Sequence, residues 1–318
     1  MAETNKPTIN QHYVPRFYLR NFAINTNTDL VYSLDMTAIN PTPRQSSLSQ
    51  ICSKDNMYEC ANTIKTSGNI DWLERNKTEK LLSECEQQQS KAISKILSVT
   101  SNKENFYTAL ICNKEEKETL FSFIVHLFLR NPAIYEQLYY DIINETKLSG
   151  QTDWDGFGRA CFKLGLNESL FNQESKTRIS YFKKYYDFLN TLSFEFLYTQ
   201  NTFITSNIPI TIYPVDKTEK CEIWLPLSSH VGVLFSENKK YKRNHLINRT
   251  GKTESLNCLV ANNANLYYQK TALLIGNNKR CLTKAYDIVS SPHFRLSDLL
   301  FKIHEKIYSI FRKENHIA

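Results

Sequence analysis

The chain has 318 residues, of which 41% are hydrophobic and 22% charged, an ordinary globular balance that excludes wholesale disorder. Only 8 glycines occur, where average usage of about 7% would give roughly 22, and neither the GxGxxG nor the GxxxxGK[ST] pattern is present. A conventional NAD or ATP site is therefore disfavoured, no cofactor is expected, and the net charge of +7 is a mild bias toward polyanions such as RNA or another nucleic acid.

The first elements follow the segment QHYVPR at residues 11–16. Pro15 suits the start of a helix, so residues 17–22 are predicted to form a short one. Residues 30–34 alternate as in a strand, and a polar loop is expected from Thr37 to about Ser53. The early strand near Val31 is expected to pair with later strands, which would bring the N-terminal motif close to residues 202–235.

Three helical blocks are predicted in the middle of the chain. Apolar residues recur at helical spacing over residues 70–99 and again over 114–147, where Pro132 is expected to bend or break the helix. A third block, residues 176–192, is rich in aromatic residues. These segments predict a helical lobe over residues 70–193.

The composition changes after Thr199. Residues 202–213 and 222–235 are rich in β-branched and aromatic residues and predict strands, residues 256–268 a helix, and residues 272–275 one more strand. Residues 299–311 have clean helical spacing.

We therefore expect an α+β fold that is predominantly helical, with a helical lobe packed on a small β-sheet and an amphipathic C-terminal helix. No linker rich in Gly or Pro divides the chain, so residues 1–318 are predicted to form a single cooperative unit. Its parts are the N-terminal motif and strand (1–60), the helical lobe (70–193), a strand-rich segment (200–275) and the C-terminal helix (280–318).

The sequence favours a cytoplasmic location. The N-terminus lacks an apolar signal segment, and the longest apolar run, residues 121–129, is too short to span a membrane, so no membrane partner is expected. The eight cysteines are scattered without a CxxC pair, which is typical of reduced thiols in a cytosol. No HExxH motif occurs and Cys52 and Cys60 are irregularly spaced, so no metal site is predicted.

Five segments together resemble a known family. They are QHYVPRFYLRNF (11–22), LRNP (129–132), FITSNIP (203–209), WLPLSS (224–229) and LNCLVANNANLYY (256–268). The pattern resembles bacterial and phage proteins that share the domain of unknown function 4238, over about residues 10–275. In that family an acidic residue typically stands where this chain has Asn207, and Asn cannot act as a carboxylate metal ligand or general base.

The motif supplies the candidate catalytic residues. His12 could transfer a proton near neutral pH, or simply bond a buried carbonyl or cap a helix. Arg16 has a guanidinium that suits phosphate, although a salt bridge explains it equally well. Arg130, in the LRNP segment, would sit at a helix C-terminus, where cations are favoured by the helix dipole in any case.

Further polar residues are candidates for substrate binding. Thr205, Ser206 and Asn207 could bind a ligand or could cap a strand-to-turn junction. The other candidates are Gln11, Tyr13, Ser228 and Asn257. No G-x-S-x-G elbow surrounds Ser228, so a serine hydrolase triad is not supported.

The leading hypothesis is a metal-independent, RNase-like enzyme with His12 as acid/base and Arg16 and Arg130 neutralising a phosphate. The resemblance suggests a toxin or phage-defence effector, with a toxin, antitoxin or phage protein as partner. Two alternatives remain open: a non-catalytic binding or sensor module for a nucleotide, nucleic acid or phage protein, and a transferase that modifies a nucleotide or macromolecule.

Overall fold

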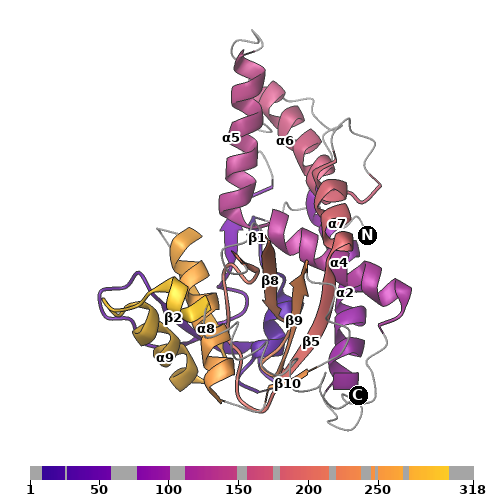
Figure 1. The fold of residues 1–318 in the computed structure, drawn as a ribbon. Helices are drawn as coiled ribbons and strands as arrows, with labels where there is room; N and C mark the ends of the chain where they lie inside the picture. Colours follow the sequence, from indigo (N-terminus) through magenta and orange to yellow (C-terminus); the bar gives the residue numbers. More distant parts are fainter. Residues whose placement is uncertain are drawn as a thin grey trace. The chain divides into compact units, whose positions relative to one another are not determined.

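The computed structural model describes residues 9–25, 27–58, 77–100, 112–148, 156–174, 180–214, 220–237, 245–247, 250–267 and 272–300. Contacts group the chain into two compact units. Unit 1 comprises residues 1–15, 52–92 and 114–188, and unit 2 comprises residues 16–51, 93–113 and 189–318. The fold is α+β and predominantly helical, as predicted, with several small sheets (Figure 1).

Unit 1 combines a short ladder with helices. Strand β1 (Asn10–His12) pairs antiparallel with β4 (Ser53–Asp55). The helices are α2 (Lys77–Thr100), α4 (Lys114–Leu129), α5 (Pro132–Leu148), α6 (Gly156–Phe171) and α7 (Tyr181–Thr191), of which α2 and α7 end in unit 2. The predicted break at Pro132 is confirmed. Asn131 Oδ1 accepts a hydrogen bond from Ala133 N at 3.0 Å, and Pro132 takes the first helical position, where its missing N–H costs nothing.

The core of unit 1 is aromatic. Phe171 contacts the rings of Tyr58, Tyr135 and His126, with ring centroids 5.4, 6.3 and 6.4 Å away. Both Phe171 and Tyr58 are fully buried. Pairs of this kind add modestly to the free energy gained from burying their area. Phe182, in the third helical block, also joins this core, with its ring centroid 5.1 Å from that of His126.

Unit 2 contains two sheets. The five-stranded sheet has the order β10 (His245–Ile247), β5 (Ser193–Thr199), β9 (Val231–Ser236), β8 (Cys221–Pro226) and β7 (Thr211–Pro214), antiparallel except between β10 and β5. The antiparallel four-stranded sheet has the order β3 (Arg44–Ser47), β2 (Leu30–Asp35), β11 (Leu273–Gly276) and β6 (Thr205–Ser206). The described parts of unit 2 also include the helices α1 (Arg16–Leu19), α8 (Thr250–Tyr267) and α9 (Lys279–Val289) and the 3-10 turn η1 (Arg20–Phe22).

The early strand pairs with a later strand, as expected: β2 pairs with β11, and β11 then pairs with β6. One expected element differs. The loop expected over residues 37–53 is partly wrong, since it contains β3. Four polar residues form that strand because they pair with β2, where the hydroxyl groups of Ser33 and Ser46 lie 2.6 Å apart. Most of the predicted helix over 299–311 lies outside the described residues.

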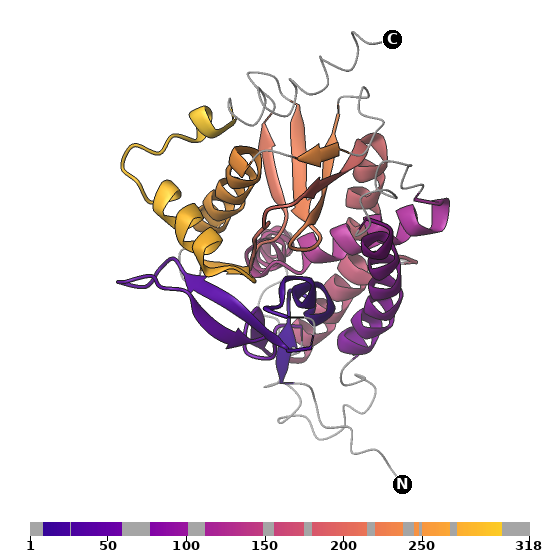
Figure 2. The ribbon, with the colours of Figure 1, turned by 90° about the horizontal axis from the view of Figure 1, so that it is seen from below.

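Helix α8 carries the core of unit 2. Its buried residues Leu256, Leu259, Val260 and Ala264 belong to one apolar cluster with Trp224. Helix α9 runs alongside α8 in both ribbon views (Figures 1 and 2) and buries Leu282, Ala285 and Val289 in the same cluster. Among the described helices, none is long and apolar enough to cross a membrane.

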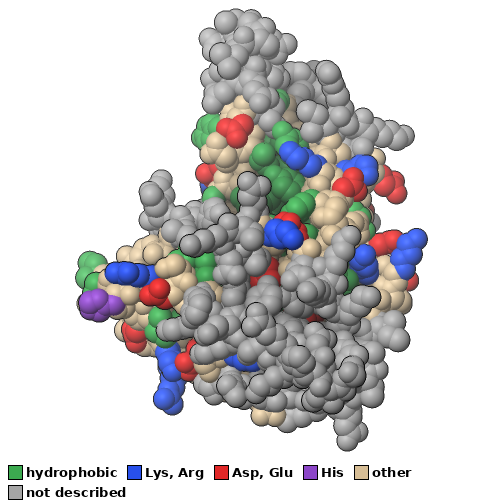
Figure 3. All heavy atoms as spheres, viewed as in Figure 1, with side chains coloured by type: hydrophobic (Ala, Val, Ile, Leu, Met, Phe, Trp, Pro, Cys, Tyr) green, Lys and Arg blue, Asp and Glu red, His purple; other side chains and the backbone are tan. Residues whose placement is uncertain are grey.

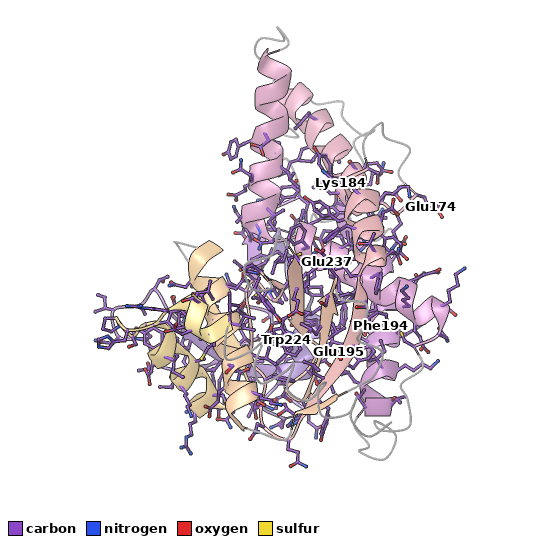
Figure 4. The ribbon with its side chains drawn as sticks, in the orientation of Figure 1. Glu174, Lys184, Phe194, Glu195, Trp224 and Glu237 are labelled. Atoms are coloured by element: carbon purple, nitrogen blue, oxygen red, sulfur yellow. The ribbon has the colours of Figure 1, made fainter. Side chains whose placement is uncertain are left out.

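Trp224 restricts the residue that fits at position 232 of the neighbouring strand β9, diagonally across from it. It lies on β8, within the five-stranded sheet (Figure 4), and is fully buried. A Cβ placed on Gly232 of β9 would lie 2.1 Å from the Trp224 ring, a distance that the packed core cannot accept.

We therefore expect Gly232→Ala to lower the free energy of unfolding by about 1–3 kcal/mol or more, because the indole must move within a filled core. Gly165 on α6 is the matched control, since a Cβ there meets nothing within 4 Å. Gly165→Ala should raise stability by about 0.5–1 kcal/mol, the usual gain for Ala in a helix. Urea unfolding followed by circular dichroism measures both, and equal stability of the two variants would contradict the packing argument.

Candidate functional site

Backbone hydrogen bonds hold the N-terminal motif against the segment that contains β4. Beside the ladder with β4, the amides of Tyr13 and Val14 both donate to the carbonyl of Cys52, at 3.0 and 3.5 Å. Cys52 and Asn56, which flank β4, have φ values of 55° and 51°, a left-handed conformation that is uncommon outside glycine. The path of the motif is thus fixed by a short, sharply turned partner strand.

Arg130 is the central polar group of unit 1. Its side chain is 3% exposed and donates from Nη1 to Glu86 Oε1 at 2.5 Å, from Nε to Tyr58 Oη at 3.3 Å, and from Nη2 to the carbonyl oxygen of His12. Burial alone would lower the pKa of Arg130, but Glu86 and Tyr58 outweigh it and the pKa is raised. The guanidinium therefore stays charged and paired.

Two residues of the motif contact Arg130 and its neighbours. His12 offers its backbone carbonyl to Arg130, while its side chain is half-buried. Gln11 is fully buried, and its Oε1 accepts a hydrogen bond from the amide of Tyr58 at 2.7 Å. Burial raises the pKa of Tyr58 to about 12, an effect that Arg130 partly offsets. Tyr58 is therefore a neutral hydrogen-bonding partner at neutral pH.

Glu79 is a second carboxyl group in this neighbourhood. It lies two helical turns before Glu86 on α2. Burial raises the pKa of Glu79. Arg130 lowers this pKa and Glu86 raises it further. Glu79 and Glu86 both interact electrostatically with Arg130, and neither was a candidate from the sequence. The seven-residue spacing of the two glutamates on one predicted helix was the available signal.

The histidine closest to Arg130 in sequence is structural. His126 is buried, with Nδ1 2.9 Å from Gln89 Nε2 and Nε2 2.9 Å from the carbonyl of Phe171. The carbonyl can only accept, so Nε2 carries the proton and Nδ1 accepts from Gln89. Burial lowers the pKa of His126 to about 4, which keeps the ring neutral at physiological pH.

In unit 2, Arg16 forms a surface ion pair. Its Nη2 lies 2.9 Å from Asp29 Oδ2, and Arg20 binds the same carboxylate at 2.8 Å. Arg20, with a smaller contribution from Arg16, lowers the pKa of Asp29 to about 2. The contacts of Arg16 are thus those of the salt-bridge alternative.

The three polar residues at β6 are buried and engaged. Thr205 Oγ1 lies 2.8 Å from Tyr18 Oη, and Ser206 Oγ bonds both the carbonyl and the amide of Ile208, at 2.8 and 3.1 Å. Asn207 Oδ1 accepts from the amide of Leu273 at 3.0 Å, so its side chain extends the pairing of β6 with β11. These contacts fit the structural role, in which side chains satisfy backbone groups at a strand end.

The last two candidates differ in surroundings. Ser228 Oγ accepts from the amides of His230 and Val231, at 3.2 and 3.1 Å, and shapes the turn between β8 and β9. Asn257, 4% exposed, accepts from the amide of Ile204 at 3.0 Å and donates to the carbonyl of Thr202 at 2.8 Å. Asn257 also lines a cavity.

That cavity lies within unit 2 and has a volume of about 420 Å³. Its walls come from the segment after β5, from α8, and from Asn278 and one face of α9 as far as Ile288. The charged residues among them are Glu254 on α8 and Arg280 and Lys284 on α9, and Lys284 Nζ lies 2.5 Å from Glu254 Oε1. Neither cation was a candidate, because only the packing of α9 on α8 reveals that both line a cavity.

The candidates therefore fall into two groups. Gln11, His12, Tyr13 and Arg130 belong to unit 1, where the backbone of the motif meets Arg130. Arg16, Thr205, Ser206, Asn207, Ser228 and Asn257 belong to unit 2, where Asn257 lines the cavity. The leading hypothesis requires His12, Arg16 and Arg130 to act on one phosphate, and this requirement stays a prediction. Among the described residues, no group of three His, Cys, Asp or Glu side chains is placed to hold a metal ion.

We expect Arg130→Met to lower the free energy of unfolding by about 3–5 kcal/mol, because Glu86, Tyr58 Oη and the His12 carbonyl lose their shared partner. Arg20→Met is the control. It removes an arginine whose side chain is 52% exposed from its ion pair with Asp29, so the loss of stability should be much smaller. Chemical denaturation compares the two. Equal losses would mean that the buried contacts of Arg130 do not stabilise the fold.

His126 should make stability depend on pH. Its pKa is about 4 in the folded chain and about 6.5 when unfolded, so the unfolded state binds more protons between these values and stability falls as pH drops through the window. From pH 7 to pH 5 the loss should be about 2 kcal/mol. His126→Gln, which cannot titrate, should lose less over the same range; identical slopes in urea denaturation would rule His126 out as the cause.

Comparison with known proteins gives one positive result. A family profile described as a protein of unknown function (DUF4238) matches residues 10–279, from β1 to the start of α9. No curated protein and no solved structure matches the chain. The match covers most of the sequence, including the N-terminal motif, Arg130 and most of the residues that line the cavity. The chain belongs to the DUF4238 family of proteins of unknown function.

Proposed function

We propose that this protein binds a small anionic ligand, of the phosphate-ester type, in the cavity of unit 2, and acts as a binding or sensor module. One observation carries the proposal: Arg280 lines the cavity, and its guanidinium has no carboxylate partner among the described residues. A volume of about 420 Å³ lies within the range of small-molecule sites, roughly 300–1,000 Å³. Guanidinium groups suit phosphate and carboxylate ligands.

The charges of the lining support an anion. Two cations, Arg280 and Lys284, face one carboxylate, Glu254, which leaves one positive charge in excess. The side chains of Lys284 and Glu254 are 50% and 31% exposed, so their ion pair is partly open to water. Pairs of this kind contribute at most about 1 kcal/mol. Lys284 can therefore turn from Glu254 toward a bound phosphate at low cost.

The wall behind these cations is rigid. Both ends of the Asn257 amide are bonded to backbone groups, and Thr253 Oγ1 lies 2.7 Å from Thr199 Oγ1 on β5. These side chains have their hydrogen bonds before any ligand arrives. A preformed wall lowers the entropic cost of binding.

The RNase-like hypothesis stays a prediction, as do the toxin or phage-defence role and the transferase alternative. Its two phosphate-neutralising residues already have carboxylate partners, Glu86 for Arg130 and Asp29 for Arg16. On the face drawn in Figure 3, the described basic and acidic side chains are interspersed, not gathered into one basic area. A long polyanion is best held by a continuous basic surface, so these observations favour a small ligand.

We expect the full chain to bind AMP and glycerol 3-phosphate, and Arg280→Ala to weaken both by about 10-fold or more, the effect of losing a charge-assisted hydrogen bond. Arg295→Ala is the control, because it removes the same charge from an exposed residue outside the cavity lining. Isothermal titration calorimetry at fixed ionic strength measures the affinities. Equal weakening by both variants would indicate nonspecific charge attraction, and no binding of either ligand would contradict the proposal.

A further inference from the structure

The described residues that line the cavity are rich in amides and hydroxyls and include no aromatic residue. Its uncharged polar members are Gln200, Asn201, Thr202, Thr253, Asn257 and Asn278. Proteins usually hold nucleobases by stacking them on aromatic rings or on the faces of arginine side chains. Hydroxyl groups, in contrast, are matched by amides, which both donate and accept hydrogen bonds. Because the described lining has no aromatic ring and its arginine, Arg280, is assigned to the phosphate, it suits a sugar better than a base.

We propose that the ligand class of this cavity is a sugar phosphate, free or as the ribose phosphate of a nucleotide, recognised with little regard to the base. The inference rests on the function proposed above and names the part of the ligand that the protein recognises. The phosphate binds Arg280 and Lys284, and the sugar hydroxyls bind Gln200 and Asn201.

Gln200 and Asn201 are the amides that remain available. The Asn257 amide is used by Ile204 and Thr202, and Asn278 Oδ1 already accepts from the amides of Arg280 and Cys281, at 3.0 and 3.4 Å. The side chains of Gln200 and Asn201 have no hydrogen-bond partner among the described residues. They can therefore meet a ligand without breaking an internal bond.

The backbone that carries these two amides is held in place. The amide of Asn201 donates to Thr199 Oγ1 at 3.1 Å, and its carbonyl accepts from His230 Nδ1 at 2.9 Å. The same Nδ1 lies 3.2 Å from the carbonyl of Thr199. Because both neighbours are acceptors, Nδ1 carries the proton. The segment after β5 thus presents its amides from a fixed position.

The phosphate side depends on side chains of α9. Arg280 and Lys284 are four residues apart, so they share one face of the helix. The backbone amides of Arg280 and Cys281 in the first turn already donate to Asn278 Oδ1, so they are not available to bind an anion. A phosphate would then have two cationic partners, with Lys284 exchanging Glu254 for the ligand.

The test compares ligands that differ by one group, using the full chain and calorimetry. We expect ribose 5-phosphate to bind about 10-fold more tightly than glycerol 3-phosphate, since ring hydroxyls add hydrogen bonds. AMP and CMP should bind within about threefold of each other, and adenosine, which lacks the phosphate, at least about 10-fold more weakly than AMP.

Gln200→Ala should reduce the preference for ribose 5-phosphate over glycerol 3-phosphate to less than about threefold. Gln50→Ala, at an exposed position of unit 2 outside the cavity, should leave the preference unchanged. Retention of the full preference in Gln200→Ala would overturn the assignment of that residue and with it the proposal.

The outcomes separate this inference from the function on which it rests. The protein does not recognise the sugar if glycerol 3-phosphate binds as tightly as ribose 5-phosphate, or if the affinities for AMP and CMP differ by about 10-fold or more. In either case only this inference fails. If none of the phosphate esters binds, both fail.

Discussion

The buried guanidinium of Arg130, which is 3% exposed, constrains the described part of unit 1. A charge removed from water is tolerated only when hydrogen-bond partners surround it, so Arg130 requires the α2 carboxylate of Glu86, the Tyr58 hydroxyl and the carbonyl of His12 at fixed positions. Those three groups come from distant parts of the sequence. Their meeting fixes β1 and the segment around Tyr58 against α2 and α4.

This constraint changes how the N-terminal motif is understood. His12 contributes a backbone oxygen to Arg130, and Gln11 contributes a side-chain oxygen to the backbone of Tyr58. Both contacts are needed to satisfy buried polar groups, whatever else the imidazole does. In the same way, Asn207 pairs with Leu273 at the end of a strand. A polar residue within a motif is therefore evidence of a required contact, and that contact can be with the protein itself.

The sequence predicts the elements whose signal is local. Helix α4 and the break before α5 follow from apolar spacing and from Asn131-Pro132, and β8 and β9 follow from their β-branched and aromatic residues. Strand β3 gives no such signal, since four polar residues become a strand only through pairing with β2. The cavity is missed for a similar reason: Arg280 and Lys284 resemble any exposed helix face until α9 is packed on α8. Sequence periodicity says which face is buried but not which neighbours the other face meets.

Unused hydrogen-bonding capacity separates the two kinds of polar residue in unit 2. Thr205, Ser206 and Asn257 are buried and bonded to internal partners, so a ligand could recruit them only by displacing those partners. Arg280 and Gln200 line the cavity with no such partners among the described residues, and a ligand gains their interactions without an exchange. The net free energy of a hydrogen bond is a small difference between large terms. Exchanging one partner for an equal one therefore contributes almost no binding free energy. Binding should therefore depend on the side chains with spare donors, held in position by those without.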